Sequence, residues 1–157
     1  MALKALLAAL LSLGAALAAA PVRAEGSECT GYPGPVHIFV NVHGVRSSEG
    51  LVAVSVYADD SKRFLAKRGA LYVGRTPAQA PTTRICVNLP HTGTFALAVY
   101  HDRNANRRFD RTGLGLPAEP FGFSNNPSTL FGLPSFSSVR INVPRSGMST
   151  DVLLKNR

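Results

Sequence analysis

Four side chains that carry oxygen atoms follow one another in a polar segment of the chain, and their spacing is that of a calcium loop. They are Asp102, Asn104, Asn106 and Asp110, at positions 1, 3, 5 and 9 of such a loop. Side chains with this spacing can turn their oxygens toward one hard cation. The sequence therefore predicts a candidate calcium site in this segment.

The calcium pattern is incomplete, and a second interpretation stays open. Arg107 stands where the turn of a calcium loop has glycine, and Gly113 stands where the last acidic ligand is expected. Arginines at positions 103, 107, 108 and 111 make the local potential positive, which weakens a cation site. The alternative is an Asx-turn loop, in which the same four side chains bind neighbouring backbone groups. Calcium is thus the one cofactor that the sequence suggests, and the sequence does not establish it.

A histidine followed by an aspartate suggests a second kind of chemistry. His101 and Asp102 resemble two members of a catalytic triad, for which Ser124 would be the nucleophile. The pattern Gly-x-Ser-x-Gly, which places a nucleophilic serine on a sharp turn, is absent around Ser124. We therefore keep a hydrolase acting on an envelope substrate as the alternative function.

Aromatic and amide side chains downstream indicate a candidate binding surface. Phe121, Phe123, Ser124, Asn125 and Asn126 are its predicted residues. The other rings that could join this platform for a sugar or peptide are Tyr100, Phe131 and Phe136. The competing interpretation is a small hydrophobic core under a long ordered loop, with the two asparagines holding the loop backbone.

The same segment carries a family resemblance. Its motifs are His101-Asp102-x-Asn104-x-Asn106-x-x-Phe109-Asp110, then Gly115, then Glu119-Pro120-Phe121-Gly122-Phe123-Ser124-Asn125-Asn126, then Phe131-Gly132-x-Pro134-Ser135-Phe136. Their combination resembles domain-of-unknown-function family 2141, a family of small secreted bacterial proteins, over roughly residues 36–154. The resemblance implies an immunoglobulin-like or prealbumin-like β-sandwich and export, and no established activity. Family members commonly have glycine where this chain has Arg107, which is a departure from the pattern.

The beginning of the chain predicts its compartment. Residues 1–24 combine Lys4, an Ala/Leu run over positions 5–20 and small residues around Ala24, as in a secretory signal peptide cleaved after Ala24. Cleavage removes two of the 17 basic residues and none of the nine acidic ones, so the mature chain keeps a net charge of +6. We expect a periplasmic or secreted protein without a transmembrane segment in the mature chain. Export disfavours nucleic acid as a partner.

The two cysteines fit this compartment. Cys29 and Cys86 are the only cysteines among 157 residues, and an oxidising compartment favours their pairing in one disulfide. A metal or redox pair finds little support, because the C-x-x-C spacing is absent.

Hydrophobic alternation predicts the elements that must position these side chains. Period-two patterns or short apolar runs bounded by turn residues occur at positions 36–43, 51–58, 70–73, 83–87, 95–100, 136–143 and 148–154. The first two and the last two are expected to form hairpins, and a helix of one or two turns is expected at 62–68 after Asp60. About seven strands with one short helix and a long ordered loop predict an all-β, antiparallel sandwich. Its expected extent is 36–157, after an N-terminal extension at 25–35.

These expectations favour a non-enzymatic function. A length of 157 residues is that of a single domain, and no decisive catalytic constellation is present. We expect a binding or interaction module of the bacterial cell envelope, with an unknown envelope protein or glycan as partner.

Overall fold

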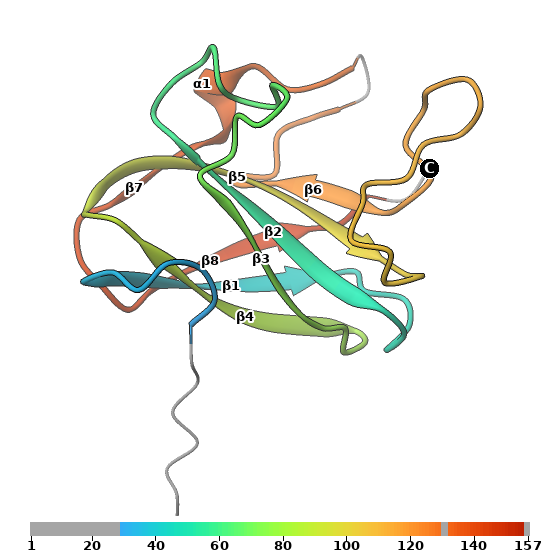
Figure 1. Ribbon diagram of the computed structural model, residues 1–157, viewed down its shortest axis with the longest axis horizontal. Coiled ribbons are helices and arrows are strands. Elements are labelled where there is room, and N and C mark those ends of the chain that lie inside the picture. Colours follow the sequence, from blue (N-terminus) through green and yellow to red (C-terminus); the bar gives the residue numbers. More distant parts are fainter. Residues whose placement is uncertain (1–28, 130–131, 156–157) are drawn as a thin grey trace, which may run out of the picture.

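The computed structural model describes residues 29–129 and 132–155 and shows two facing β-sheets (Figure 1). The first sheet has the strand order β4 (Thr82–Leu89), β1 (Val36–His43), β8 (Met148–Leu153). The second has the order β3 (Tyr72–Pro77), β2 (Leu51–Ala58), β5 (Gly93–Asp102), β6 (Phe121–Phe123), and β7 (Arg140–Val143) also pairs with β5. The predicted all-β sandwich is confirmed. β6 is a strand that alternation did not reveal, because it has only three residues.

The space between the sheets is filled by aliphatic side chains, which we call the inner core. In β1 the even-numbered residues from Val36 to Val42 are buried and the residues between them are half-buried, as the alternation predicts. From the facing sheet, Val54, Leu97 and Val99 pack against them. Burial of this apolar surface is the main term that holds the two sheets together.

β5 is buried on both of its faces. Leu97 and Val99 face the inner core, whereas Ala96 and Tyr100 belong to a second hydrophobic cluster on the outer face of the second sheet. The prediction of a central strand at 95–100 is therefore confirmed. Its second face is covered by loops rather than by another sheet.

Both predicted hairpins are wrong. β1 pairs with β4 and β8, whereas the following strand β2 pairs with β3 and β5 in the other sheet. Likewise β7 pairs with β5, and β8 crosses to the first sheet, where it runs parallel to β1. Residues 44–50 and 144–147, which carry the turn signals, connect a strand of one sheet to a strand of the other sheet and not two neighbours in the same sheet. Alternation marks a strand, but it does not identify the strand's neighbour.

The predicted helix at 62–68 is also wrong. Asp60 does cap a first turn, because its carboxylate accepts the Lys62 N–H at 2.9 Å. The segment then continues as a series of turns, with Leu65 and Arg68 in the left-handed region at φ 56° and 60°. The described helix is instead α1 (Phe136–Val139), at a place where the sequence predicted a strand.

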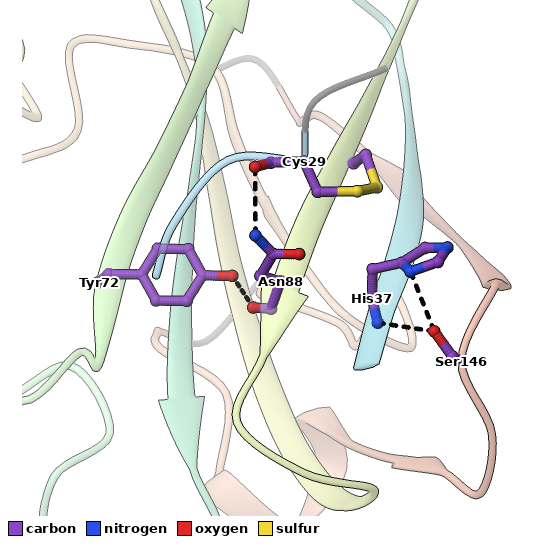
Figure 2. The surroundings of a disulfide bond; sticks show 6 residues. Cys29, His37, Tyr72, Asn88 and Ser146 are labelled. Atoms are coloured by element: carbon purple, nitrogen blue, oxygen red, sulfur yellow. Dashed lines mark hydrogen bonds between the residues drawn. A yellow bond between two sulfur atoms is a disulfide. The ribbon is translucent and has the colours of Figure 1, made fainter. Parts of the chain in front are cut away.

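A disulfide joins the N-terminal extension to the first sheet (Figure 2). Cys29 is bonded to Cys86 of β4, as predicted. Asn88 supports the junction. Its side-chain amide donates to the Cys29 carbonyl at 3.2 Å, and its backbone carbonyl accepts a hydrogen bond from the hydroxyl of Tyr72 in β3. The predicted signal peptide at 1–24 lies outside the described residues. Within the described ranges, no helix is long and apolar enough to cross a membrane.

Candidate functional site

The outer face of the second sheet carries a cluster of rings, which we call the outer aromatic cluster. Its aromatic members are Tyr57, Phe64, Tyr100, Phe109, Phe121, Phe123 and Phe136. Neighbouring rings meet edge to face, for example Tyr100 with Phe109 at 5.3 Å between centroids and Phe121 with Phe123 at 5.8 Å. The expected core under the long loop is thus present. Phe131 lies outside the described residues.

The outer aromatic cluster leaves a pocket of about 240 Å³ open to solvent. Its walls come from three connections, since Leu65 belongs to the segment after β2, Arg111 and Pro117 to the segment after β5, and Leu133 to the segment before α1. Its remaining lining residues are Ser55, Tyr57, Ala98, Val99, Tyr100, Phe109, Phe121, Gly122 and Phe123. Pockets that are mainly aromatic with a few polar groups are typical of ligand sites.

Four polar side chains border this pocket: Ser55, Tyr57, Tyr100 and Arg111. Burial raises the pKa of the Tyr57 hydroxyl, and a hydrogen bond with Ser55 offsets part of this rise. Burial also raises the pKa of Tyr100, and a hydrogen bond and the positive charge of Arg75 lower it in part. Both phenols are therefore neutral hydrogen-bonding groups at ordinary pH. Arg111 supplies the positive charge at the rim.

The sequence prediction missed Tyr57, Phe109 and Arg111 as parts of this surface. A signal for Tyr57 was present. Val52, Val54 and Val56 face the inner core, so period two turns Tyr57 to the opposite side. Phe109 and Arg111 lie in an irregular segment, where no periodicity shows the direction of a side chain.

The side chains of Ser124, Asn125 and Asn126 form hydrogen bonds with backbone groups of neighbouring segments. The buried Ser124 hydroxyl accepts the Leu97 N–H at 3.0 Å and donates to the Val139 carbonyl. The Asn125 amide donates to the Arg140 carbonyl at 2.6 Å, and the Asn126 carbonyl oxygen accepts the Leu153 N–H at 2.7 Å. Of the predicted binding residues, Phe121 and Phe123 line the pocket, and these three do not.

His101 is fully buried and held by the backbone. Its Nε2 lies 2.8 Å from the Glu49 carbonyl, so Nε2 carries the proton and donates it there. Its Nδ1 has no hydrogen-bond partner among the described residues. The Ser124 hydroxyl, which a hydrolase would need as nucleophile, bonds to Leu97 and Val139 rather than to a histidine. The triad is thus not assembled in this structure.

The predicted calcium residues form a hydrogen-bonded loop, here called the Asp102 loop (residues 102–110). Both Asp102 carboxylate oxygens accept backbone N–H groups, from Asn106 at 3.0 Å and from Arg107 at 2.7 Å. The side-chain amides of Asn104 and Asn106 donate to the Asp110 carboxylate at 2.9 Å and 2.8 Å. These hydrogen bonds lower the pKa of Asp110, and the bond from Asn106 has the larger effect. The arrangement contains the Asx-type bonds of the second interpretation, and the four side chains do lie together.

Glu119 is an acidic neighbour of this loop that the prediction did not include. Its Oε2 accepts the Asp110 N–H at 3.0 Å, and the residue is 8% exposed. Burial raises its pKa, and the nearby carboxylates of Asp102 and Asp110 add to the shift. In the part of the chain that the structure describes, no group of three or more His, Cys, Asp or Glu residues is arranged to hold a metal.

Comparison with known proteins places the chain among bacterial proteins. No curated protein and no solved structure matches it. The profile of one family, described as an uncharacterized protein conserved in bacteria (DUF2141), matches residues 40–151. This match covers most of the sandwich, from the middle of β1 to β8, together with the Asp102 loop and the outer aromatic cluster. The chain therefore belongs to the DUF2141 family of bacterial proteins.

Proposed function

We propose that the protein is an exported, non-enzymatic binding module of the bacterial cell envelope that takes its ligand in the pocket of the outer aromatic cluster. The observation that carries this proposal is the open pocket of about 240 Å³ on a rigid sheet face. Tyr57, Tyr100 and Arg111 border it with polar groups among aromatic walls. The leader-like residues 1–24 support a periplasmic or secreted location.

A glycan is the ligand class that the pocket fits best. A sugar ring has apolar C–H faces, which pack on aromatic side chains, and hydroxyl groups, which need a few hydrogen-bonding partners. The two neutral tyrosine hydroxyls can both donate and accept hydrogen bonds. Arg111 can in addition bind a carboxylate or phosphate substituent, which many envelope glycans carry.

Filling the pocket tests this proposal. Ala98 lies on its floor, so Ala98→Leu would occupy part of the cavity without removing a polar group. Ala66→Leu is the matched control, because Ala66 is exposed on the segment after β2 and does not line the pocket. We expect calorimetric titration with soluble peptidoglycan and lipopolysaccharide fragments to show binding that weakens at least about tenfold in Ala98→Leu only. Binding that survives Ala98→Leu would contradict the site, and a lack of binding to any glycan would contradict the ligand class.

The hydrolase alternative has its own test. It requires His101, Asp102 and Ser124 to act together on an envelope ester or glycan. The assay is turnover by the wild-type protein on a panel of such substrates, followed by Ser124→Ala and Asp102→Ala. Turnover that both variants abolish would favour an enzyme over the binding module.

A further inference from the structure

A small hairpin stands out from the body of the protein after β5, and we call it the Leu114 hairpin (residues 111–117). Arg111 and Pro117 form its antiparallel bridge, and the Thr112 N–H donates to the Leu116 carbonyl at 2.8 Å. The turn closes through the Gly115 N–H and the Thr112 carbonyl, also at 2.8 Å. In Figure 1 the segment between β5 and β6 projects beyond the sheets. The hairpin is thus an ordered protrusion.

The tip of this hairpin presents leucine to solvent. Leu114 is 89% exposed and Leu116 is 48% exposed. Leu133, 63% exposed, lies on the same side, because it lines the same pocket as Arg111 and Pro117. Exposed apolar side chains gathered at one place indicate a surface that another body covers.

Basic side chains lie in the segment that carries the hairpin, and one of them lies at the tip. Four exposed arginines belong to the segment that carries the hairpin: Arg103, Arg107, Arg108 and Arg111. The Arg111 guanidinium reaches the tip itself and donates to the Gly115 carbonyl at 2.9 Å. The acidic residues of this part of the chain, Asp102, Asp110 and Glu119, lie in or beneath the Asp102 loop, and the hairpin itself contains no acidic residue.

A second basic segment borders the same pocket. The turns after β2 contribute Leu65 to its wall and expose Lys62, Arg63, Lys67 and Arg68. These basic turns therefore lie on the same side of the second sheet as the hairpin, across the pocket from Arg111 and Pro117. A partner of negative charge with an apolar interior matches both features.

We propose that the Leu114 hairpin docks the protein on an anionic lipid surface, with Leu114 and Leu116 entering the headgroup boundary and the arginines facing lipid phosphates. Basic side chains close to such a surface each contribute a favourable electrostatic term, and small apolar insertions add to it. A soluble polyanion would use the arginines and not the leucines. This proposal does not depend on the ligand of the aromatic pocket.

Flotation with lipid vesicles tests the proposal. The protein is purified after export with its own N-terminal segment, and mass spectrometry establishes where its chain begins. The vesicles are phosphatidylcholine alone or phosphatidylcholine with about one third phosphatidylglycerol. We expect binding to the anionic vesicles only. Equal binding to both kinds of vesicle, or to neither, would overturn the proposal.

Two sets of variants separate docking from simple adsorption of a basic protein. Leu114→Ser with Leu116→Ser should weaken vesicle binding about tenfold or more, because the apolar contribution is lost. Arg111→Gln with Arg63→Gln should weaken it about 25-fold at low salt and reduce its dependence on salt, because Arg111 lies at the tip and Arg63 lies in the basic turns beside the same pocket. Tyr32→Ser is the control, since Tyr32 is 78% exposed in the N-terminal extension. Vesicle binding that tolerates the leucine changes would overturn the proposal.

A soluble polyanion provides the remaining comparison. Heparin should bind the leucine double variant as well as the wild-type protein, and it should bind the arginine double variant less well. If heparin binding also needed the leucines, a polyanion partner would replace the lipid surface. The thermal midpoints of all variants should stay within about 2 °C of the wild type, because the changed side chains are exposed.

Discussion

The inner core and the outer aromatic cluster lie on opposite faces of the same strands, and they differ in how far they are closed off from solvent. The inner core is aliphatic and closed between two sheets, with valines such as Val40 and Val54 fully buried. The outer aromatic cluster packs on β2 and β5 from the other side, is covered by loops, and leaves a pocket. The same strands therefore provide a stable layer on one face and an accessible surface on the other.

This difference indicates how the protein divides stability and function. The inner core holds the two sheets together and the disulfide ties the N-terminal extension to the first sheet, so the loops over the outer face need not contribute equally to folding. Loops that rest on a rigid scaffold are where binding residues are commonly found. The following changes, in order of decreasing expected effect, test whether the two faces are separable in this way.

Removing the disulfide should have the largest effect, and it should act on folding alone. Cys29 and Cys86 are 57 residues apart, and closing a loop of this length stabilises a fold by about 4 kcal/mol in the chain-entropy model. We expect the double change Cys29→Ser and Cys86→Ser to lower the free energy of unfolding, measured by denaturant titration, by about that amount. Ligand binding by the molecules that remain folded should be unchanged. Altered affinity in the folded fraction would mean that the two faces are coupled.

Ser124→Ala should have the next largest effect, because this hydroxyl links the outer cluster to β5. The change leaves the buried Leu97 N–H without its side-chain acceptor, which costs about 1–3 kcal/mol. Ser137→Ala is the control, since Ser137 is exposed in α1. The measurement is the urea midpoint of both variants. An unchanged midpoint for Ser124→Ala would contradict the structural role and leave the serine free for chemistry.

The sequence predicted the inner core better than the outer face. Alternation in β1 and the doubly apolar run of β5 identify buried residues, because burial between two sheets imposes period two. The neighbours of β2 and of β8 in their sheets were not predicted, because strand pairing depends on contacts between residues that are far apart in the chain. The pocket escaped as well, because its walls come from separate segments that only the tertiary fold brings together. For His101, Asp102 and Ser124, the residue types fit both catalysis and burial, and only geometry distinguishes the two.

Calcium tests the interpretation of the Asp102 loop, with a smaller effect expected. An ion would have to compete with the amides of Asn104 and Asn106 for Asp110, so the site would belong to the weak, millimolar class of extracellular calcium sites. Calcium at about ten times such a dissociation constant stabilises the fold by about 1.4 kcal/mol, or roughly 5 °C in the thermal midpoint. The measurement is a melt with calcium and one with chelator, repeated for Asp110→Asn. Equal midpoints for the wild type would remove the calcium interpretation and leave the Asx-turn loop.

The ionisation of Glu119 should produce the smallest effect, and its sign is fixed by the raised pKa. A buried carboxyl whose pKa lies above its ordinary value of 4.5 holds its proton more tightly in the folded protein than in the unfolded chain. The resulting stabilisation is present in full below pH 4.5 and is lost as the pH rises through the folded-state pKa. Glu119→Gln keeps an oxygen that can accept the Asp110 N–H and cannot ionise. We therefore expect the stability of the wild type, relative to this variant, to fall as the pH rises from 4 toward 7 in parallel urea titrations.

The variant also serves as the control for other carboxylates. The lowered pKa values of Asp110 and Asp151 change stability with pH in the opposite direction, and this change is subtracted where both proteins share it. A difference that does not change with pH would mean that the Glu119 carboxylate is solvated, and that the floor beneath the Asp102 loop is more open than the inner core.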